Sequence, residues 1–262
     1  VNGFGLNKSG ELGFGNFDNQ TKPLNLSERP EEFNDILRYE PSNNKQQNAD
    51  TLVLDSAKNT YKKVQPLTLK EDSERGSVFD FQNNSQYFDI GDVHDNVFST
   101  GTFSISYWVY LRSDRSTEYS KRAGMIASKW YSSDRSWSNN SFIIYSTGSF
   151  VSGKGNQVSR IIEPGGASYK APINKWTHYV WSLDKGKISV FENGKKMNML
   201  NDNIVHEFSA VTKYSLSLGI LRHNRKYSLN GKIDDFRIFD HPTNESQATA
   251  LYKNVGSNSD VS

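Results

Sequence analysis

Three pairs of acidic residues stand next to each other in this sequence and are candidates for paired acid–base chemistry. The pairs are Glu31-Glu32, Glu71-Asp72 and Asp234-Asp235. A retaining glycosidase needs two carboxyl groups about 5–5.5 Å apart. On a strand that arrangement requires acids two residues apart, because adjacent side chains point to opposite faces. These pairs therefore do not predict a site that cleaves a glycosidic bond.

The histidines show no pattern typical of a metalloenzyme, and other catalytic signatures are also missing. The five histidines are His94, His178, His206, His223 and His241. They form no His-x-His or HExxH arrangement, and the chain contains no GxSxG, P-loop or dinucleotide fingerprint. The chain has no cysteine, which excludes disulfides, thiolate zinc sites and a cysteine nucleophile. We expect a protein that is not an enzyme.

The segment 112–140 is the strongest candidate for ligand binding. It carries six basic side chains against three acidic ones, with aromatic residues between them. Exposed rings beside Arg and Asn suit stacking on sugars, anchoring of a protein interface or binding of anionic glycans. The candidate ligand-binding residues are Tyr119, Arg122, Trp130, Tyr131, Arg135 and Trp137. The alternative is that Trp130 ends a core strand and the rest is a solvated loop.

The overall composition limits the possible partners. Among 262 residues, 31 Lys and Arg stand against 29 Asp and Glu, which is too even for a nucleic-acid footprint over the whole domain. No apolar run reaches the roughly 20 residues of a membrane span, and no signal peptide is recognisable. We therefore expect neither nucleic-acid binding nor a membrane span.

The first 75 residues or so differ in character from the rest. Gly3-Phe4-Gly5 recurs as Gly13-Phe14-Gly15 among turn-forming residues, which indicates an irregular arm or a degenerate repeat. Within this arm, Ser27 can cap a short helix over residues 27–39 that ends before Pro41. The predicted domains are an arm over 1–50, a β-sandwich over 51–256 and a polar tail over 257–262.

From residue 78 onward, apolar and polar residues alternate with the period of two that strands require. Asn83-Asn84 suggests a hairpin, Asn193-Gly194 a tight turn, and residues 245–252 a late helix. The candidate strands are residues 51–54, 78–81, 87–90, 102–111, 124–129, 141–145, 177–183, 187–192, 214–218 and 232–239. Many short strands without alternating helices predict an all-β, antiparallel two-sheet sandwich. Its sheets would be separated by Trp108, Trp176 and Trp181.

Several of these strands resemble the laminin-G-like family of concanavalin A-like domains. The similar blocks are 101–109 (GTFSISYWV), 175–180 (KWTHYV), 188–194 (ISVFENG), 216–219 (LSLG), 230–239 (NGKIDDFRIF) and 248–252 (ATALY). They occur in the family's order. The resemblance implies a jelly-roll sandwich with an irregular N-terminal arm and short helices.

The resemblance also implies calcium, because relatives hold Ca²⁺ with the acid of their G-x-I-D strand, here Asp234. The family's FDGxxDYV stretch reads FQNNSQYF over residues 81–88, so both of its acids are replaced by Gln. Ca²⁺ takes six to eight oxygen ligands, and this loss weakens a site unless Asp80 and Asp89 compensate. In the alternative, Asp234 only accepts hydrogen bonds from loop amides.

Taken together, these features favour a non-catalytic carbohydrate- or surface-binding module of an extracellular or surface-displayed assembly. Its partner would be a glycan or a neighbouring structural protein. One alternative is a structural component of a virion or surface layer that uses the sandwich for packing. Another is a diverged polysaccharide-cleaving enzyme, because the concanavalin A-like class includes glucanases.

Overall fold

The computed structural model describes side chains over 69–82, 86–91, 94–112, 124–130, 141–154, 164, 170–200, 203–208, 214–221 and 227–253. For residues 2–5, 20–25, 37–39, 53–54, 60–61, 68 and 160–163 it describes the backbone of short strands. The chain divides into two units, Val1–Asn34 and Asp35–Ser262. In the first unit, β1 (Asn2–Gly5) pairs antiparallel with β2 (Gln20–Asn25).

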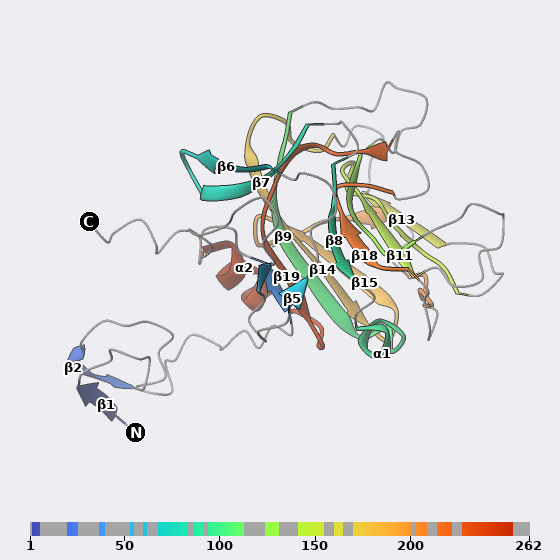
Figure 1. The fold of residues 1–262 in the computed structure, drawn as a ribbon. Coiled ribbons are helices and arrows are strands. Elements are labelled where there is room, and N and C mark those ends of the chain that lie inside the picture. The colour runs from blue at the N-terminus through green and yellow to red at the C-terminus, as the bar shows by residue number, and fades with distance from the viewer. Residues whose placement is uncertain are drawn as a thin grey trace. The chain divides into compact units, whose positions relative to one another are not determined.

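The second unit is an antiparallel two-sheet jelly-roll sandwich, as the alternation predicted (Figure 1). The seven-stranded sheet has the order β17-β13-β12-β11-β10-β18-β8. Its strands are β8 (Phe88–Gly91), β10 (Met125–Ser128), β11 (Phe142–Tyr145), β12 (Phe150–Ser152), β13 (Arg160–Pro164), β17 (Met199–Leu200) and β18 (Leu216–Leu218).

The eight-stranded sheet has the order β16-β15-β14-β9-β19-β7-β6, with β3 added beside β19. Its strands are β3 (Leu37–Tyr39), β6 (Thr68–Asp72), β7 (Gly76–Gln82), β9 (Phe103–Leu111), β14 (Trp176–Asp184), β15 (Lys187–Glu192), β16 (Lys195–Lys196) and β19 (Asn230–Phe239). The remaining elements are the pair β4 (Val53–Leu54) and β5 (Thr60–Tyr61), and the helices α1 (Asp95–Phe98) and α2 (Glu245–Lys253).

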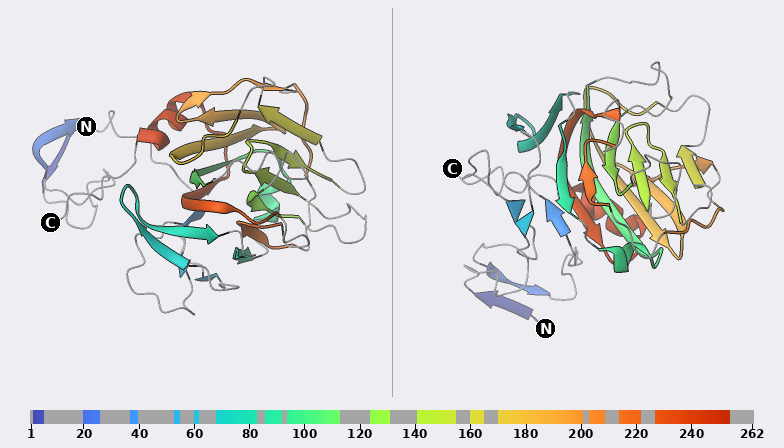
Figure 2. Two further views of the ribbon diagram at one scale, coloured as in Figure 1. Left: turned by 90° about the horizontal axis from the view of Figure 1, so that it is seen from above. Right: turned by 45° about the vertical axis from the view of Figure 1, so that its right-hand side comes forward.

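The hydrophobic core lies between the two sheets, which face each other in the views of Figure 2. Phe142 and Phe150 come from one sheet and Tyr107 and Trp181 from the other, all of them buried. The Trp181 indole N–H donates to the Tyr107 hydroxyl over 3.1 Å, so the polar atoms of this pair are satisfied inside the core.

The predicted role of the tryptophans needs correction. Only Trp181 fills the space between the sheets, whereas Trp108 lies on the outer face of β9 because Tyr107 and Val109 point into the core. Trp176 also lies on the outer face, where it contacts Asp72 of β6. Alternation along a strand decides which of two adjacent aromatic residues is inside, and it excludes Trp108.

Two local predictions also differ from the structure. The proposed hairpin around Asn83-Asn84 is wrong, because β7 and β8 belong to different sheets. The C-terminal part of the predicted helix over 27–39 is a strand, since Leu37–Tyr39 pairs with residues 236–238 of β19. Pairing with β19 outweighs the local helix preference there. Residues 27–36 of that predicted helix lie outside the described residues.

Other local predictions are confirmed. The late helix is α2, and both Asn193 and Gly194 have positive φ angles, as a type I′ turn requires. Gly194 must remain small, because an added Cβ would lie 2.9 Å from Thr249 Cα of α2. Among the described residues, no helix is long and apolar enough to cross a membrane.

Candidate functional site

One row of side chains crosses the outer face of the seven-stranded sheet. In the strand register, Asp89 of β8 pairs with Ser217 of β18, and Ser217 pairs with Ser128 of β10. Ser128 pairs with Ile143 of β11, and Ile143 pairs with Val151 of β12. Register partners share a face, so the row runs from polar side chains at β8 to apolar ones at β12. We call this row and the residues beside it the serine face.

The two serines in the middle of the serine face are buried without a protein partner. Ser128 is 1% exposed and Ser217 is fully buried. In the part of the chain that the structure describes, neither hydroxyl makes a hydrogen bond, and the same holds for buried Ser141 before β11. A buried hydroxyl without a partner costs about 1–3 kcal/mol. Buried unsatisfied polar groups are uncommon in native structures, so adjacent ones require an explanation.

Aromatic and apolar side chains adjoin these serines. Trp130 follows Ser128 by two residues, and Tyr145 is the register partner of Met125. Both rings belong to a buried cluster that is separate from the main core and also contains Met125, Ile143, Val151 and Leu221, with Tyr227 packed against it. Trp130 is only 3% exposed, which is the core position that the alternative interpretation of the sequence assigned to it.

The other predicted ligand-binding residues cannot be placed on this face. Tyr119, Arg122, Tyr131, Arg135 and Trp137 lie outside the described residues. Of that set the structure locates Trp130 alone, and sequence reasoning did not single out Ser128 and Ser217. The alternation SLSL at residues 215–218 could have placed Ser217 opposite the core-facing leucines. No sequence signal shows that its hydroxyl is unpaired.

On the outer face of the eight-stranded sheet, in contrast, the buried serines have hydrogen-bond partners. The Ser104 hydroxyl donates to the His241 carbonyl over 2.8 Å, and the Ser182 hydroxyl accepts the Thr243 N–H at the same distance. The Ser106 hydroxyl lies 2.9 Å from His178 Nε2. All three serines are buried, and each has a partner. We call this surface the paired face.

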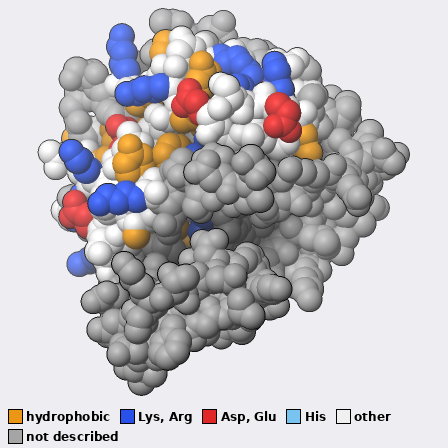
Figure 3. Space-filling view, turned by 90° about the vertical axis from the view of Figure 1, so that its left-hand side faces the viewer, with side chains coloured by type: hydrophobic (Ala, Val, Ile, Leu, Met, Phe, Trp, Pro, Cys, Tyr) orange, Lys and Arg blue, Asp and Glu red, His pale blue; other side chains and the backbone are white. Residues whose placement is uncertain are grey.

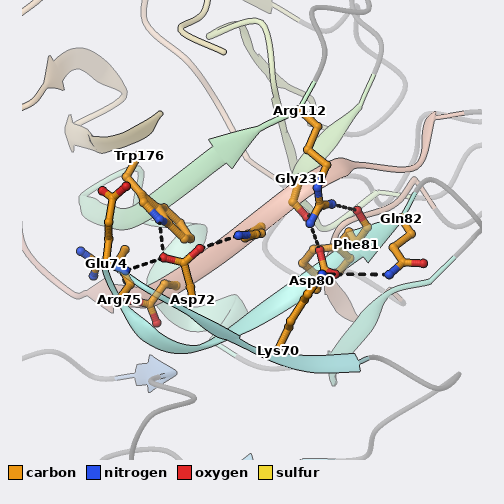
Figure 4. Close-up of polar contacts among 12 residues, drawn as sticks. Lys70, Asp72, Glu74, Arg75, Asp80, Phe81, Gln82, Arg112, Trp176 and Gly231 are labelled. Carbon is orange, nitrogen blue, oxygen red and sulfur yellow. Dashed lines mark hydrogen bonds and ion pairs between the residues drawn. The ribbon is translucent and has the colours of Figure 1, made fainter. Parts of the chain in front are cut away.

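Carboxylates on the paired face are also matched with cations (Figure 4). Asp72 Oδ2 lies 2.5 Å from Lys232 Nζ, and Asp72 Oδ1 accepts from the Trp176 indole N–H over 3.1 Å. The Arg112 guanidinium forms an ion pair with fully buried Asp80. Beyond these pairs, Lys and Arg side chains stand around hydrophobic ones on the described part of the surface in Figure 3.

Arg75 is the centre of an aromatic cluster on the same face. Its guanidinium carbon lies 4.2 Å from the ring centroid of Trp108 and 5.4 Å from that of Trp176. Its Nε lies 2.6 Å from Asp234 Oδ2, and both side chains are buried. Cation–π contacts and a buried ion pair therefore hold the β6–β7 turn against the sheet.

The titration behaviour of two groups reflects these surroundings. Burial raises the pKa of Asp72, but hydrogen bonds from Lys232, the Glu74 N–H and Trp176 outweigh it, and the net pKa is lowered. Burial lowers the pKa of His178 to about 3. At neutral pH, Asp72 is therefore ionised and His178 uncharged, and neither is poised as a general acid.

The predicted calcium ligands do not form a common site. Asp80 and Asp234 lie on the paired face, each beside an arginine, whereas Asp89 lies on the other sheet and accepts from the Gly91 N–H. Among the described residues, no group of three or more His, Asp or Glu side chains could hold a metal ion. Asp80 and Asp234 do not fit Ca²⁺, because the guanidinium beside each of them repels a second cation. Calcium binding remains a prediction.

Comparison with solved structures supports the fold. Domain 4 of an extracellular arabinanase from Geobacillus stearothermophilus, solved with arabinotriose, matches 82% of this chain and 97% of its own chain, with 20% identity and a TM-score of 0.59. The receptor-binding domain of botulinum neurotoxin type G matches 84% of this chain and 51% of its own, with 15% identity and a TM-score of 0.57. The binding domain of botulinum neurotoxin serotype D matches 84% and 51%, with 14% identity and a TM-score of 0.56.

These identities establish a shared fold and nothing finer. No curated protein matches the chain. The family model described as the concanavalin A-like lectin/glucanase superfamily, a laminin-G-like model, matches residues 82–249. This match covers more than half of the 262 residues and includes strands of both sheets. The chain belongs to the concanavalin A-like lectin/glucanase superfamily, within its laminin-G-like branch.

Proposed function

We propose that this chain is a non-catalytic carbohydrate-binding module whose serine face receives the sugar. The observation that carries the proposal is the pair of adjacent buried hydroxyls, Ser128 and Ser217, which lack a hydrogen-bond partner in the part of the chain that the structure describes. A sugar offers hydroxyl groups that both donate and accept, which is the chemistry these two serines can complement. On the paired face, comparable serines already have partners.

The aromatic residues of the serine face support the same ligand class. Trp130 and Tyr145 flank the serine row, and rings beside a few well-placed polar groups are typical of small-molecule sites. The solved arabinanase domain 4 binds arabinotriose on the same fold. The serine face is closed to solvent in this structure, so it must open for the ligand to enter.

The charges on the paired face argue against the glycosidase alternative. A general acid must hold a proton near neutral pH, and this requires a carboxyl group with a raised pKa. Asp72 has a lowered pKa, and Asp80, Asp234 and Asp235 each have an arginine partner. These ion pairs support the proposal that the chain is a binding member of the superfamily and not a glycosidase.

For the location, the assembly and the further ligand contacts, we keep the predictions made from the sequence. We propose that the module acts outside a cell, on a cell surface or on a virion, as part of a larger assembly. Tyr119, Arg122, Tyr131, Arg135 and Trp137 are proposed as further contacts to the glycan. These five residues flank strand β10, which carries Ser128, in the sequence.

A glycan array followed by titration calorimetry tests the function. We expect the chain to bind an oligosaccharide, and we expect Ser128→Ala to weaken binding at least about tenfold, the effect of losing a well-placed hydrogen bond. The same substitution should leave the melting temperature unchanged or raise it, because it removes an unsatisfied polar group. Trp137→Ala and Arg135→Ala test the predicted loop contacts in the same assay.

A matched control separates ligand binding from folding. Ser104→Ala removes a buried hydroxyl that has a partner, so it should lower the melting temperature and leave sugar binding intact. Absence of binding across the array would overturn the proposed function. If Ser128→Ala, Trp137→Ala and Arg135→Ala also left the assembly state unchanged, the ligand role proposed for these residues would be discarded. The structural-component alternative would then be favoured.

A further inference from the structure

One short segment joins the edges of the two sheets. Lys195 and Lys196 form β16, the end strand of the eight-stranded sheet, and Met199 and Leu200 form β17, the end strand of the seven-stranded sheet. The backbone therefore passes from one sheet to the other within residues 195–200, which we call the edge segment. Because both strands are only two residues long, few ladder hydrogen bonds hold the edge segment in place.

Two methionines attach the edge segment to the interior. Met197 and Met199 are half-buried and pack against the main hydrophobic core, whereas Leu200 is 50% exposed. The Met197 N–H donates to the Val190 carbonyl of β15 over 2.8 Å, and β17 pairs with the end of β13. The two thioether side chains therefore supply the apolar contacts between this segment and the core.

These thioethers can be reached by an oxidant, in contrast to the third methionine. Met125 of β10 is fully buried in the separate cluster that contains Trp130. The chain has three methionines and no cysteine, so thioethers are its only sulfur groups. Hydrogen peroxide transfers one oxygen atom to a thioether: the O–O bond breaks, an S–O bond forms, the sulfur is oxidised and the peroxide is reduced to water. The product is a polar sulfoxide.

We propose that Met197 and Met199 are a reversible oxidation site that controls whether the edge segment stays attached to the core. An S–O group placed in an apolar contact is unfavourable unless it finds a hydrogen-bond donor. The oxidised side chains therefore turn to solvent, and the edge segment detaches. Methionine sulfoxide reductases convert the sulfoxide back to the thioether, which restores the contact. This inference does not depend on the proposed sugar binding.

Peroxide treatment followed by tryptic peptide mass spectrometry tests accessibility on the unaltered chain. Cleavage after Lys and Arg places Met125 in peptide 123–129 and the other two methionines in peptide 197–213. We expect peptide 197–213 to gain oxygen at least about tenfold faster, because a fully buried sulfur reacts only when the structure opens locally.

The physical consequence is measured on the oxidised chain. Its melting temperature should fall by at least about 3 °C, as expected when a polar group enters an apolar contact. Hydrogen exchange should increase over residues 195–200 and stay unchanged in the central strands β9 and β14. Treatment with methionine sulfoxide reductases A and B, which act on the two sulfoxide epimers, should restore both values.

A double variant and a matched control assign the effect to these residues. Met197→Leu with Met199→Leu keeps side chains of similar volume that peroxide does not oxidise, so it should melt within about 2 °C of the unaltered chain. Peroxide should no longer lower its melting temperature. Met125→Leu removes the buried thioether instead, and it should keep the full response to peroxide.

Two results would overturn the inference. The first is equal oxidation rates for peptides 123–129 and 197–213, which would mean that the edge segment offers no selective site. The second is an unchanged melting temperature and unchanged hydrogen exchange in a chain whose Met197 and Met199 are both oxidised. Should the double leucine variant fail to fold, these measurements on the unaltered chain still decide the matter.

Discussion

The two outer faces of this sandwich carry similar residue types and use them in opposite ways. On the paired face, Ser104, Ser106 and Ser182 have hydrogen-bond partners and Asp80 and Asp234 have arginines. On the serine face, Ser128 and Ser217 are equally buried and have no partner in the described part of the chain. The paired face is not fully satisfied, because His178 Nδ1 also lacks a hydrogen-bond partner among the described residues, but its serine hydroxyls are held by protein groups whereas those of the serine face are not. Whether the buried serines have hydrogen-bond partners, more than the composition of each face, distinguishes the structural surface from the candidate binding surface.

Breaking the ion pair at the centre of the paired face should give the largest effect. Arg75→Ala removes the guanidinium beside buried Asp234 and its contacts with Trp108 and Trp176. We expect the free energy of unfolding to fall by about 3–5 kcal/mol, as in other buried pairs that lose one partner. Urea unfolding monitored by tryptophan fluorescence measures it.

An exposed ion pair is the control for that experiment. The side chains of Lys154 and Glu207 are 56% and 50% exposed, and Lys154→Ala should cost about 0.5 kcal/mol or less. If Arg75→Ala and Lys154→Ala had similar effects, the paired face would not be the structural element that its contacts indicate.

Acidification should have the second largest effect on stability, and it should act through His178 on the paired face. Its pKa in the folded chain is about 3, against 6.5 for an ordinary histidine, because it is buried. The unfolded chain therefore takes up a proton below pH 6.5 that the folded chain does not. Above pH 6.5 the burial of neutral His178 costs no free energy of unfolding. As the pH falls from 6.5 towards 3, the free energy of unfolding falls by up to about 1.4 kcal/mol per pH unit.

Urea unfolding of wild type and His178→Gln at pH 7.5, 6, 5 and 4 checks this effect. The variant should be less stable at pH 7.5 and should lose less stability on acidification than the wild type. Parallel pH dependence in the two proteins would show that His178 is not buried in its neutral form.

Comparing one serine from each face tests the contrast directly. Ser104→Ala leaves the buried His241 carbonyl without its donor, so the unfolding free energy should fall by about 1–2 kcal/mol. Ser217→Ala removes an unpaired hydroxyl and should change stability by about 0 to +1 kcal/mol. Thermal unfolding of both variants gives the comparison. A loss for Ser217→Ala as large as that for Ser104→Ala would mean that Ser217 has a partner in solution, and the two faces would no longer differ.

Removal of calcium should have the smallest effect. The Asp80 and Asp234 carboxylates already have arginine partners, so EDTA should leave the melting temperature within about 1 °C of its value in calcium. Asp234→Asn should be destabilised to the same extent with and without calcium. A clear rise in melting temperature with Ca²⁺ that is absent in Asp234→Asn would establish the site that the family resemblance implied.

Much of the fold could be read from the sequence because alternation is a local property. The period of two over residues 102–111 and 232–239 predicted β9 and β19, and Asn193-Gly194 predicted its turn, since these depend on neighbours along the chain. Alternation also excluded Trp108 from the core, although the prediction had placed it there.

The candidate site depended on information that no single strand contains. By itself, the sequence determined the two-sheet sandwich, most of its strands and the absence of cysteine chemistry, because each follows from composition or from short-range pattern. Only the tertiary structure decided that β7 and β8 belong to different sheets, that Arg75 meets Asp234, and that Ser128 lies beside Ser217. Those are contacts between residues far apart in the chain, fixed by strand register and by which face each strand turns to the core.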